Sequence, residues 1–414
     1  MQNLSQDKFS LLYTGPVKAL FKAFPDGALR FVGGCVRNVL LGADVEDIDL
    51  ATQLKPHEVE KALLAAGIKA IPTGREHGTI TARLADTNFE ITSLRKDVET
   101  DGRRAVIAYT QDWDEDALRR DFTMNALYAD AQGRLYDPTG HGLEDLKARR
   151  LRFIENAQDR VSEDYLRILR FFRFIAYYVG DRPLDKEALN ACRTGRAGLK
   201  KLSSERIWAE LKKLLSAPQP VRALRIMLQQ DILEALLPSS TNVDGLEALL
   251  RLEAREALQI DPLLRLMSMS LRDGAAMSAV ARDLKMSKAE TKRLVEWGED
   301  INILDPQASE REKLAAIYHA GRQTVLDRCF LRAAGERDPI ISSRWMSLAD
   351  LALGWNAPDF PVSGQDLKAL GIEAGPAMGR AMKALTALWV KSGFTADKQK
   401  LLMILPMIMG KPAP

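Results

Sequence analysis

The stretch GGCVRNVLLGADVEDIDLAT (residues 33–52) decides the fold expected of this chain. Its first half, GGCVRNVLLG, has apolar residues at helical spacing between a glycine pair and a closing glycine, which predicts a helix. Its second half, DIDLAT, clusters apolar and β-branched residues as a strand does. Because the preceding run ALRFV is also typical of a strand, a strand–turn–helix–strand unit is predicted around Gly33 and Gly34.

Two aspartates, Asp47 and Asp49, stand two residues apart in the second half of this stretch. Residues i and i+2 of a strand point to the same face, so their carboxylates are predicted to converge. Like charges at short range are costly unless a cation lies between them, and Mg²⁺ prefers carboxylate and phosphate oxygens. A two-metal site of this kind can activate a 3′-hydroxyl and stabilise departing pyrophosphate. The alternative for an isolated DxD is an acidic pair that is merely solvated.

The glycine pair strengthens the first interpretation. Gly33 and Gly34 lie between the predicted strand and helix, where bare backbone amides cradle phosphates. Arg37, one turn into the helix, reaches the same anion. A glycine pair followed by an arginine and then by the DxD is much more specific than either motif alone.

Length and composition limit the class of protein. The 414 residues are too many for one compact core, and 46% hydrophobic and 28% charged residues are ordinary for a soluble protein. No signal peptide or membrane-spanning run is predicted, and three cysteines without a CxxC favour a reduced cytoplasm. Residues 1–150 hold 20 basic and 23 acidic side chains, whereas the remaining residues hold 39 and 33, a balance that suits phosphates.

The motifs of the first half resemble, in order, those of the class II nucleotidyltransferases, the family of tRNA CCA-adding enzymes and bacterial poly(A) polymerases. That family usually has GGxVRDxLLG followed by DxDxAT. Five further segments match: PTGREHGT (72–79), FEITSLR (89–95), RRDFTMNA (119–126), EDYLRILRFFRF (163–174) and SSERIWAEL (203–211). A distal segment, 363–385, also looks like the tail of bacterial members. The resemblance is most specific to a bacterial CCA-adding enzyme.

The resemblance implies an α+β nucleotidyltransferase head, a small mixed sheet with helices, followed by an all-α extension. The sequence agrees, because strand-like runs such as TITARL and FEITSLR stop near residue 140 and amphipathic helical patterns follow. We expect a catalytic head over 1–145 and a helical neck with the base-reading helix and an RNA-binding motif over 146–216. A helical body over 217–355 and a helical tail over 356–414 complete the expected division.

The resemblance also assigns roles to single residues. Asp47 and Asp49 would bind the metals, with Glu90 as a further catalytic carboxylate. Gly33, Gly34, Arg37 and Arg120 would hold the triphosphate, and Asp121 and Asn125 would bracket the ribose. Asp164 and Arg167 would read the incoming base, with Arg170 and Arg173 near the triphosphate. The ordinary alternatives are a surface glutamate for Glu90 and a helix cap for Asp121.

The chemistry of Asp164 and Arg167 agrees with this role. Three residues apart, they are predicted to share one helical face. Adenine and cytosine both present an exocyclic amine beside a ring nitrogen acceptor, which a carboxylate and a guanidinium satisfy. Guanine and uracil present the opposite pattern, and sites built on polar pairing reject such mismatches strongly. ATP and CTP are therefore the expected substrates, and a simple i,i+3 salt bridge is the alternative.

Two features bear on which member of the family this is. Arg95–Arg119 keeps a full-length polar loop that members adding only CC shorten, and PTGREHGT stands where poly(A) polymerases carry a more basic stretch. Both favour complete CCA addition over poly(A) synthesis or partial addition. Asn38 departs from the family, which usually has Asp there. If that side chain only orients Arg37, the Asn carbonyl oxygen substitutes for it.

The expected partner is tRNA, held by its acceptor and T-arm backbone without sequence reading, because every tRNA must be served. The candidate contacts are Lys200, Lys201, Arg206, Lys212 and Lys213. Solvated helix charge is the alternative for these five. A tRNA-binding relative without catalysis, and transfer to a small molecule, are the competing functions. No membrane association and no obligate protein partner are expected.

Overall fold

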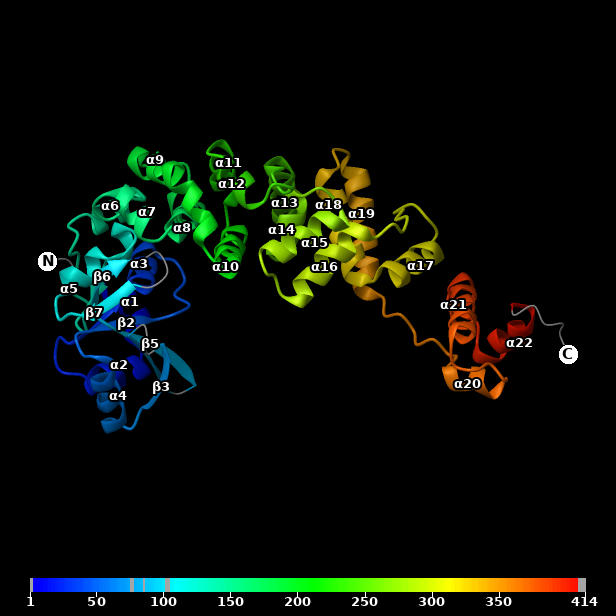
Figure 1. The fold of residues 1–414 in the computed structure, drawn as a ribbon, viewed down its shortest axis with the longest axis horizontal. Helices are drawn as coiled ribbons and strands as arrows, with labels where there is room; N and C mark the ends of the chain where they lie inside the picture. The colour runs from blue at the N-terminus through cyan, green and yellow to red at the C-terminus, as the bar shows by residue number, and fades with distance from the viewer. Residues whose placement is uncertain (1–2, 75–77, 85, 101–104, 409–414) are drawn as a thin grey trace. The chain divides into compact units, whose positions relative to one another are not determined.

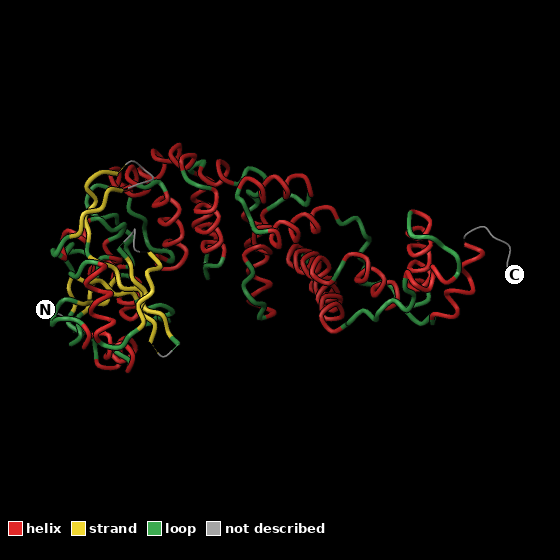
Figure 2. Tube along the Cα trace, turned by 60° about the horizontal axis from the view of Figure 1, so that its bottom comes forward, coloured by secondary structure: helices red, strands yellow, loops and turns green. Residues whose placement is uncertain are grey.

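The computed structural model describes residues 3–74, 78–84, 86–100 and 105–408. The backbone contacts divide the chain into two compact units, Met1–Leu236 and Leu237–Pro414. The strands all lie in the N-terminal unit, as the yellow segments of Figure 2 show for the residues described. The expected α+β head with an all-α extension is therefore confirmed. The finer division into four domains stays a prediction.

The N-terminal unit is built on a mixed seven-stranded sheet in the order β3-β4-β5-β2-β1-β8-β9. Its central strands are β1 (Leu29–Val32), β2 (Asp49–Thr52) and β5 (Thr87–Ser93). β2 runs antiparallel to β1 and parallel to β5. The remaining strands are β3 (Lys69–Gly74), β4 (Thr79–Leu84), β8 (Tyr128–Ala129) and β9 (Leu135–Tyr136). The quoted stretch thus crosses the middle of the sheet, which places its polar residues at the centre of the head.

A separate two-stranded hairpin, β6 (Arg95–Thr100) with β7 (Ala105–Tyr109), stands outside that sheet. It is followed by helix α5 (Trp113–Leu118). The segment Arg95–Arg119 was expected to be a polar loop, but most of its described residues form this hairpin and helix. The AVIAY run supplies the β-branched and aromatic residues that pair as a strand, and Asp112 caps α5 by accepting from the Asp114 amide.

Helices cover the sheet and extend the N-terminal unit (Figure 1). The helices that alternate with the strands in sequence, or directly precede or follow them, are α1 (Gln6–Leu12), α2 (Gly15–Ala23), α3 (Gly34–Leu41), α4 (Pro56–Ala65), the 3₁₀ turn η2 (Thr123–Asn125) and α6 (Gly142–Ala148). The extension comprises α7 (Ala157–Glu163), α8 (Leu166–Phe174), the π-helix η3 (Ile175–Val179), α9 (Lys186–Gly195), η4 (Arg196–Lys201), α10 (Ser204–Leu215), α11 (Pro220–Gln229) and α12 (Ile232–Leu236).

All the regular elements in the described residues of the C-terminal unit are helices. Its first helices are α13 (Val243–Glu256), α14 (Pro262–Met269), α15 (Gly274–Asp283), α16 (Lys288–Glu299) and α17 (Glu310–Ala320). They are followed by α18 (Arg322–Gly335), α19 (Pro339–Gly354), α20 (Gly364–Ala369), α21 (Pro376–Lys391) and α22 (Lys398–Ile408). Among the described helices of both units, none combines the length and the apolarity that crossing a bilayer requires.

Candidate active site

The glycine turn joins β1 to α3 as the sequence predicts. Gly33 adopts a left-handed φ of 68°, which strains any residue with a side chain, and Gly34 begins α3. A β-carbon at Gly33 would lie 3.6 Å from Nη1 of Arg120, and one at Gly34 would lie 3.8 Å from Nη2 of Arg37. Two guanidiniums therefore flank bare backbone amides at a helix start, which is an arrangement suited to phosphate oxygens.

The carboxylates gather at the adjacent edge of β2. The strand begins at Asp49, so Asp47 lies two residues before it and not within it as predicted. The pairing accounts for this difference, because β1 accompanies β2 only as far as Leu50 and the β5 register begins with Asp49 opposite Glu90. Burial raises the pKa of Asp49, and the nearby charges of Glu90 and Asp47 raise it further.

This carboxylate cluster fits a divalent cation, because repulsion between like charges is what a bound Mg²⁺ relieves. Asp47 and Asp49 both line a cavity of about 1120 Å³ in the N-terminal unit. Glu90 does not line it, and among the described residues no group of three or more His, Cys, Asp or Glu side chains is arranged to hold a metal. Two aspartates completed by substrate phosphates match the way Mg²⁺ is commonly bound.

Arg37 is almost fully buried, at 7% exposure, and its donors are largely used within the protein. Nη1 donates to Asn125 Oδ1 at 2.5 Å, and Nη2 donates to the Tyr178 hydroxyl at 2.6 Å. Nε and Nη2 both donate to Asn38 Oδ1, at 3.1 and 2.8 Å. The guanidinium also lies 4.2 Å from the Tyr178 ring centroid. The Asn38 carbonyl oxygen therefore orients Arg37, as expected if the family's Asp has only that task.

Arg120 is held by a buried carboxylate beneath the site. Its Nη2 donates to Asp116 Oδ2 at 2.8 Å, and Arg119 donates to the other oxygen of Asp116 at 2.7 Å. The Tyr128 hydroxyl also donates to Asp116, at 2.8 Å. Burial alone would raise the pKa of Asp116, but the guanidiniums of Arg120 and Arg119 more than offset it and hold that pKa well below its usual range.

Asp121 and Asn125, which are expected to bracket the ribose, are hydrogen-bonded to each other. Asp121 Oδ1 accepts from Asn125 Nδ2 at 2.9 Å and from the Phe122 amide at 2.8 Å. The N-cap residue of η2 is Phe122, so Asp121 is not the helix cap of the alternative interpretation. Its Oδ2 pairs with Arg170 at 2.5 Å. Burial would raise the pKa of Asp121, but the charge of Arg170 and these hydrogen bonds lower it.

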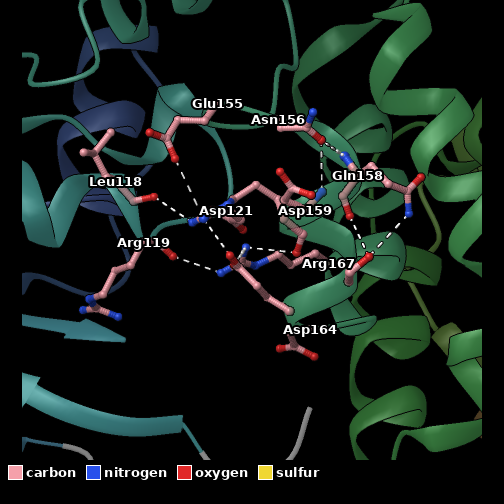
Figure 3. Close-up of polar contacts among 12 residues, drawn as sticks. Leu118, Arg119, Asp121, Glu155, Asn156, Gln158, Asp159, Asp164 and Arg167 are labelled. Carbon is pink, nitrogen blue, oxygen red and sulfur yellow. Dashed lines mark hydrogen bonds and ion pairs between the residues drawn. The ribbon is translucent and has the colours of Figure 1, made fainter. Parts of the chain in front are cut away.

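Asp164 and Arg167 do not lie on one helix, contrary to the prediction. Asp164 is extended (φ −149°, ψ 104°) in the break between α7 and α8, because its Oδ1 accepts from the Leu166 amide and starts α8 there. Its Oδ2 pairs with Arg206 at 2.7 Å. Figure 3 shows the Asp164 carboxylate directed away from the contacts around Arg167.

Arg167 is fixed by partners other than Asp164. Nη1 donates to Glu163 at 2.7 Å and to the Arg160 carbonyl at 3.0 Å, while Nη2 donates to the Arg119 carbonyl at 2.9 Å. Figure 3 shows the last of these contacts, which ties α8 to the head. The simple i,i+3 salt bridge is therefore not the arrangement adopted. Both residues nevertheless line the same cavity.

One cavity of about 1120 Å³ brings most of the predicted residues together. Its lining includes Gly33, Gly34, Arg37, Asp47, Asp49, Arg120, Asp121, Asn125, Asp164, Arg167, Arg170 and Arg173. Arg173 lines it while pairing with the buried Glu210 of α10 at 3.1 Å. The same cavity is thus lined by the two aspartates, the glycine turn, several guanidiniums and the predicted base-reading pair.

The five candidate RNA contacts are exposed on two elements, Lys200 and Lys201 on η4 and the others on α10. Arg206 and Lys213 also line the cavity, and the Arg206 pairing with Asp164 gives it a place beside the base-reading pair that sequence reasoning missed.

Three supporting residues were also missed, namely Asp116, Glu163 and Tyr178. The i+3 and i+4 spacing from Asp116 to Arg119 and Arg120, and from Glu163 to Arg167, was an available signal. Tyr178 gave none, because it reaches Arg37 only through the fold.

Comparison with known proteins places this architecture in a class. Residues 29–152 match the model of the poly A polymerase head domain, and residues 183–243 match that of a probable RNA and SrmB-binding site of polymerase A. The fold and the site thus define a nucleotidyltransferase head joined to an RNA-binding helical region.

Individual relatives narrow the class. The mitochondrial CCA tRNA nucleotidyltransferase 1 of Homo sapiens is 34% identical over 96% of this chain and 92% of its own length. The CCA-adding enzyme of Oceanobacillus iheyensis is 39% identical over half of each chain. The crystal structure of the Bacillus stearothermophilus CCA-adding enzyme in complex with CTP superposes with a TM-score of 0.73, at 25% identity over 99% of this chain and 98% of that one. The chain belongs to the CCA tRNA nucleotidyltransferase family.

Proposed function

We propose that this protein adds C, C and A in turn to the 3′ end of tRNA, using CTP and ATP. The observation that carries the proposal is the shared cavity, in which Asp47 and Asp49 lie in the same space as Asp164 and Arg167. A metal-binding edge accounts for nucleotidyl transfer, and the second pair accounts for the choice of base. Full-length relatives with this activity in their names support the assignment.

Asp47 and Asp49 would hold Mg²⁺, which supplies activation of the tRNA 3′-hydroxyl and stabilisation of the departing pyrophosphate when bound. Glu90, opposite Asp49 in the sheet, is proposed to add negative charge to that edge. The amides of Gly33 and Gly34 and the guanidinium of Arg120 would bind the triphosphate, because they face one another across the turn.

Arg37 would act mainly by positioning, because four of its hydrogen bonds go to protein partners. It holds Asn125 in place, and Asn125 with Asp121 would bracket the ribose. Arg170 and Arg173, paired with Asp121 and Glu210, are proposed to lie near the triphosphate as fixed positive charges.

For base choice, Arg167 keeps donors beyond those that bind Glu163 and the backbone carbonyls. Its guanidinium would donate to the ring nitrogen of cytosine or adenine while Asp164 accepts from the exocyclic amine. Arg206 pairs with one oxygen of Asp164 and would keep that carboxylate oriented. The hairpin β6–β7 with α5 is proposed to help the pocket change from C to A.

The RNA would be held by its acceptor and T-arm backbone. The match of residues 183–243 to an RNA-binding model supports a role for Lys200, Lys201, Arg206, Lys212 and Lys213 in this contact. We keep the cytoplasm as the proposed compartment, although several of the full-length relatives carry mitochondrial names.

A direct assay tests the function. Purified protein with Mg²⁺ is given tRNA ending before C, C and A, with each labelled triphosphate alone and in combination. We expect two additions from CTP and a third that requires ATP, and no product from GTP or UTP. Long tails from ATP alone would indicate a poly(A) polymerase, addition that stops early would indicate a partial enzyme, and binding without incorporation would indicate a non-catalytic relative.

A further inference from the structure

A second cavity, of about 300 Å³, lies wholly within the C-terminal unit. Its walls come from α13, α14, α16 and α18, which Figure 1 shows in one group of helices. The volume stands at the small end of the range for ligand pockets. A cavity of this volume has room for a phosphate group with part of its sugar.

The lining of this cavity is strongly basic. Arg272, Arg328 and Arg332 line it, and among its described lining residues there is no carboxylate. We call these three residues the arginine pocket. The remaining polar lining, such as Asn242 and Ser268, is neutral, so the charged groups among the lining residues are all positive.

Two of these arginines are held in place by groups that leave most of the positive charge unneutralised. Arg272 donates from Nε to the Trp297 carbonyl at 3.0 Å and from Nη2 to the Asp300 carbonyl. Arg328 donates to the Asn302 carbonyl at 2.7 Å and pairs with the Asp300 carboxylate. Among the described residues Arg332 has no ion-pair partner. One carboxylate therefore lies beside three guanidiniums. The pKa of Arg272 is lowered by burial and by the charges of Arg328 and Arg332.

Two other arginines of the same unit, the buried Arg265 and the partly buried Arg293, have carboxylate partners of their own. Arg265 pairs with Glu253 at 2.6 Å, and Arg293 pairs with two carboxylates, Asp327 at 2.7 Å and Asp261 at 2.6 Å. Each of these two arginines is neutralised by a carboxylate. The arginine pocket has one carboxylate, Asp300 beside Arg328, for its three guanidiniums. Arg272 and Arg332 are exposed, so an incoming anion could reach them and supply further negative charge.

Exposed aliphatic side chains adjoin the same cluster. Leu271 precedes Arg272, while Ile301 and Ile303 flank Asn302, whose carbonyl binds Arg328. They are 74%, 94% and 87% exposed. Solvent-facing aliphatics gathered beside a charged pocket indicate an interaction surface. A free phosphate ion would leave them uncovered, whereas a polynucleotide would place sugars and bases against them.

We propose that the arginine pocket binds a backbone phosphate of the RNA substrate and that Leu271, Ile301 and Ile303 contact the adjoining nucleotides. The proposal rests on the proposed function for the identity of the RNA. It adds an attachment point in the C-terminal unit, where the sequence did not indicate which individual residues contact the RNA.

The first test compares two charge reversals in the full-length protein. Arg332→Glu alters the pocket without removing a described ion pair. Arg251→Glu makes the same charge change at an exposed position of α13, where it removes only the long, exposed pair with Glu247. We expect Arg332→Glu to weaken binding of tRNA lacking its 3′ end about tenfold and to lower the slope of log Kd against log salt by about one. Arg251→Glu should change Kd by less than about twofold. Equal effects of the two variants would overturn the proposal.

The second test separates RNA from a free anion. Ile301→Ser with Ile303→Ser should weaken tRNA binding without altering its salt dependence, because no charge is removed. Ile340→Ser, at another exposed position of the unit, is the matched control. Inorganic phosphate that bound wild type but not Arg332→Glu, with tRNA affinity equal in both, would show a free-anion site and overturn the RNA assignment.

Kinetics keep this inference distinct from the proposed function. Arg332→Glu should raise KM for tRNA and leave kcat at saturating tRNA and the affinity for CTP unchanged. If wild type bound tRNA but added no nucleotide, the proposed function would fail while the binding comparison still decided the role of the pocket.

Discussion

Asn38 is the residue at which this chain departs from its family motif, and its contacts explain why the change is tolerated. Its Oδ1 accepts two hydrogen bonds from Arg37, and its Nδ2 donates to the Asp44 carbonyl at 2.9 Å. An aspartate would keep the contacts with Arg37 and lose the hydrogen bond to the Asp44 carbonyl. The amide therefore joins the orientation of Arg37 to the turn that leads to Asp47.

We expect Asn38→Ala to lower the free energy of unfolding by roughly 1–3 kcal/mol, because buried Arg37 donors lose their acceptor. The KM for CTP and that for ATP should rise together, since the base-reading pair is untouched. Asn38→Asp should keep near-normal kinetics. Urea unfolding and initial rates would measure these effects, and an inactive Asn38→Asp would show that the amide donor, and not the carbonyl oxygen, is what matters.

Asp116, only 1% exposed, offers a prediction about acid stability. Its folded pKa is depressed, so its contribution to stability is complete above its unfolded pKa of about 4 and is lost as the pH falls through the folded value. Asp116→Asn should destabilise the protein by roughly 3 kcal/mol at pH 7. The difference from wild type should narrow below about pH 4 in denaturant titrations. A difference independent of pH would mean that the charge of Asp116 is not what holds Arg119 and Arg120.

At the scale of elements, local sequence patterns predicted the helices, strands and turns that depend mainly on neighbouring residues. The glycine turn, α3, β2 and the FEITSLR strand followed from helical spacing, alternation and a φ that only glycine adopts readily. The break before α8 was missed because the helical periodicity runs through Asp164, whereas its carboxylate caps the next helix. The β6–β7 hairpin was missed because charged residues hid a strand pattern. Local sequence patterns could not predict that the site residues come together, because β2, η2 and α8 meet only through tertiary packing.

The break before α8 leads to a prediction, because Asp164 both starts the helix and is proposed to read the base. Asp164→Asn keeps an acceptor for the Leu166 amide and loses only the partly exposed pair with Arg206, so stability should fall by less than about 1 kcal/mol. Its amide would oppose the amine of cytosine, so the ratio of kcat/KM for CTP to that for UTP should fall about 100-fold. Asp159→Asn, on the exposed face of α7, is the control and should leave that ratio unchanged.

At the scale of the whole molecule, nucleotidyl transfer and one of the proposed RNA attachment points are assigned to separate compact units. Residues of the transfer site belong to Met1–Leu236, and the arginine pocket belongs to Leu237–Pro414. No described contact is shared between the Asn38 cluster and Arg332. Free-energy effects of substitutions that share no partners are generally additive.

This separation makes a quantitative prediction for kcat/KM with tRNA at limiting CTP. Asn38→Ala acts on nucleotide affinity, and Arg332→Glu acts on tRNA affinity, so the double variant should lose the product of the two single losses, within about a factor of two. Single-turnover rates at varied tRNA and CTP would separate the two effects. A double loss much smaller than the product would mean that the two sites are coupled, for example because tRNA seated on the arginine pocket helps form the nucleotide site.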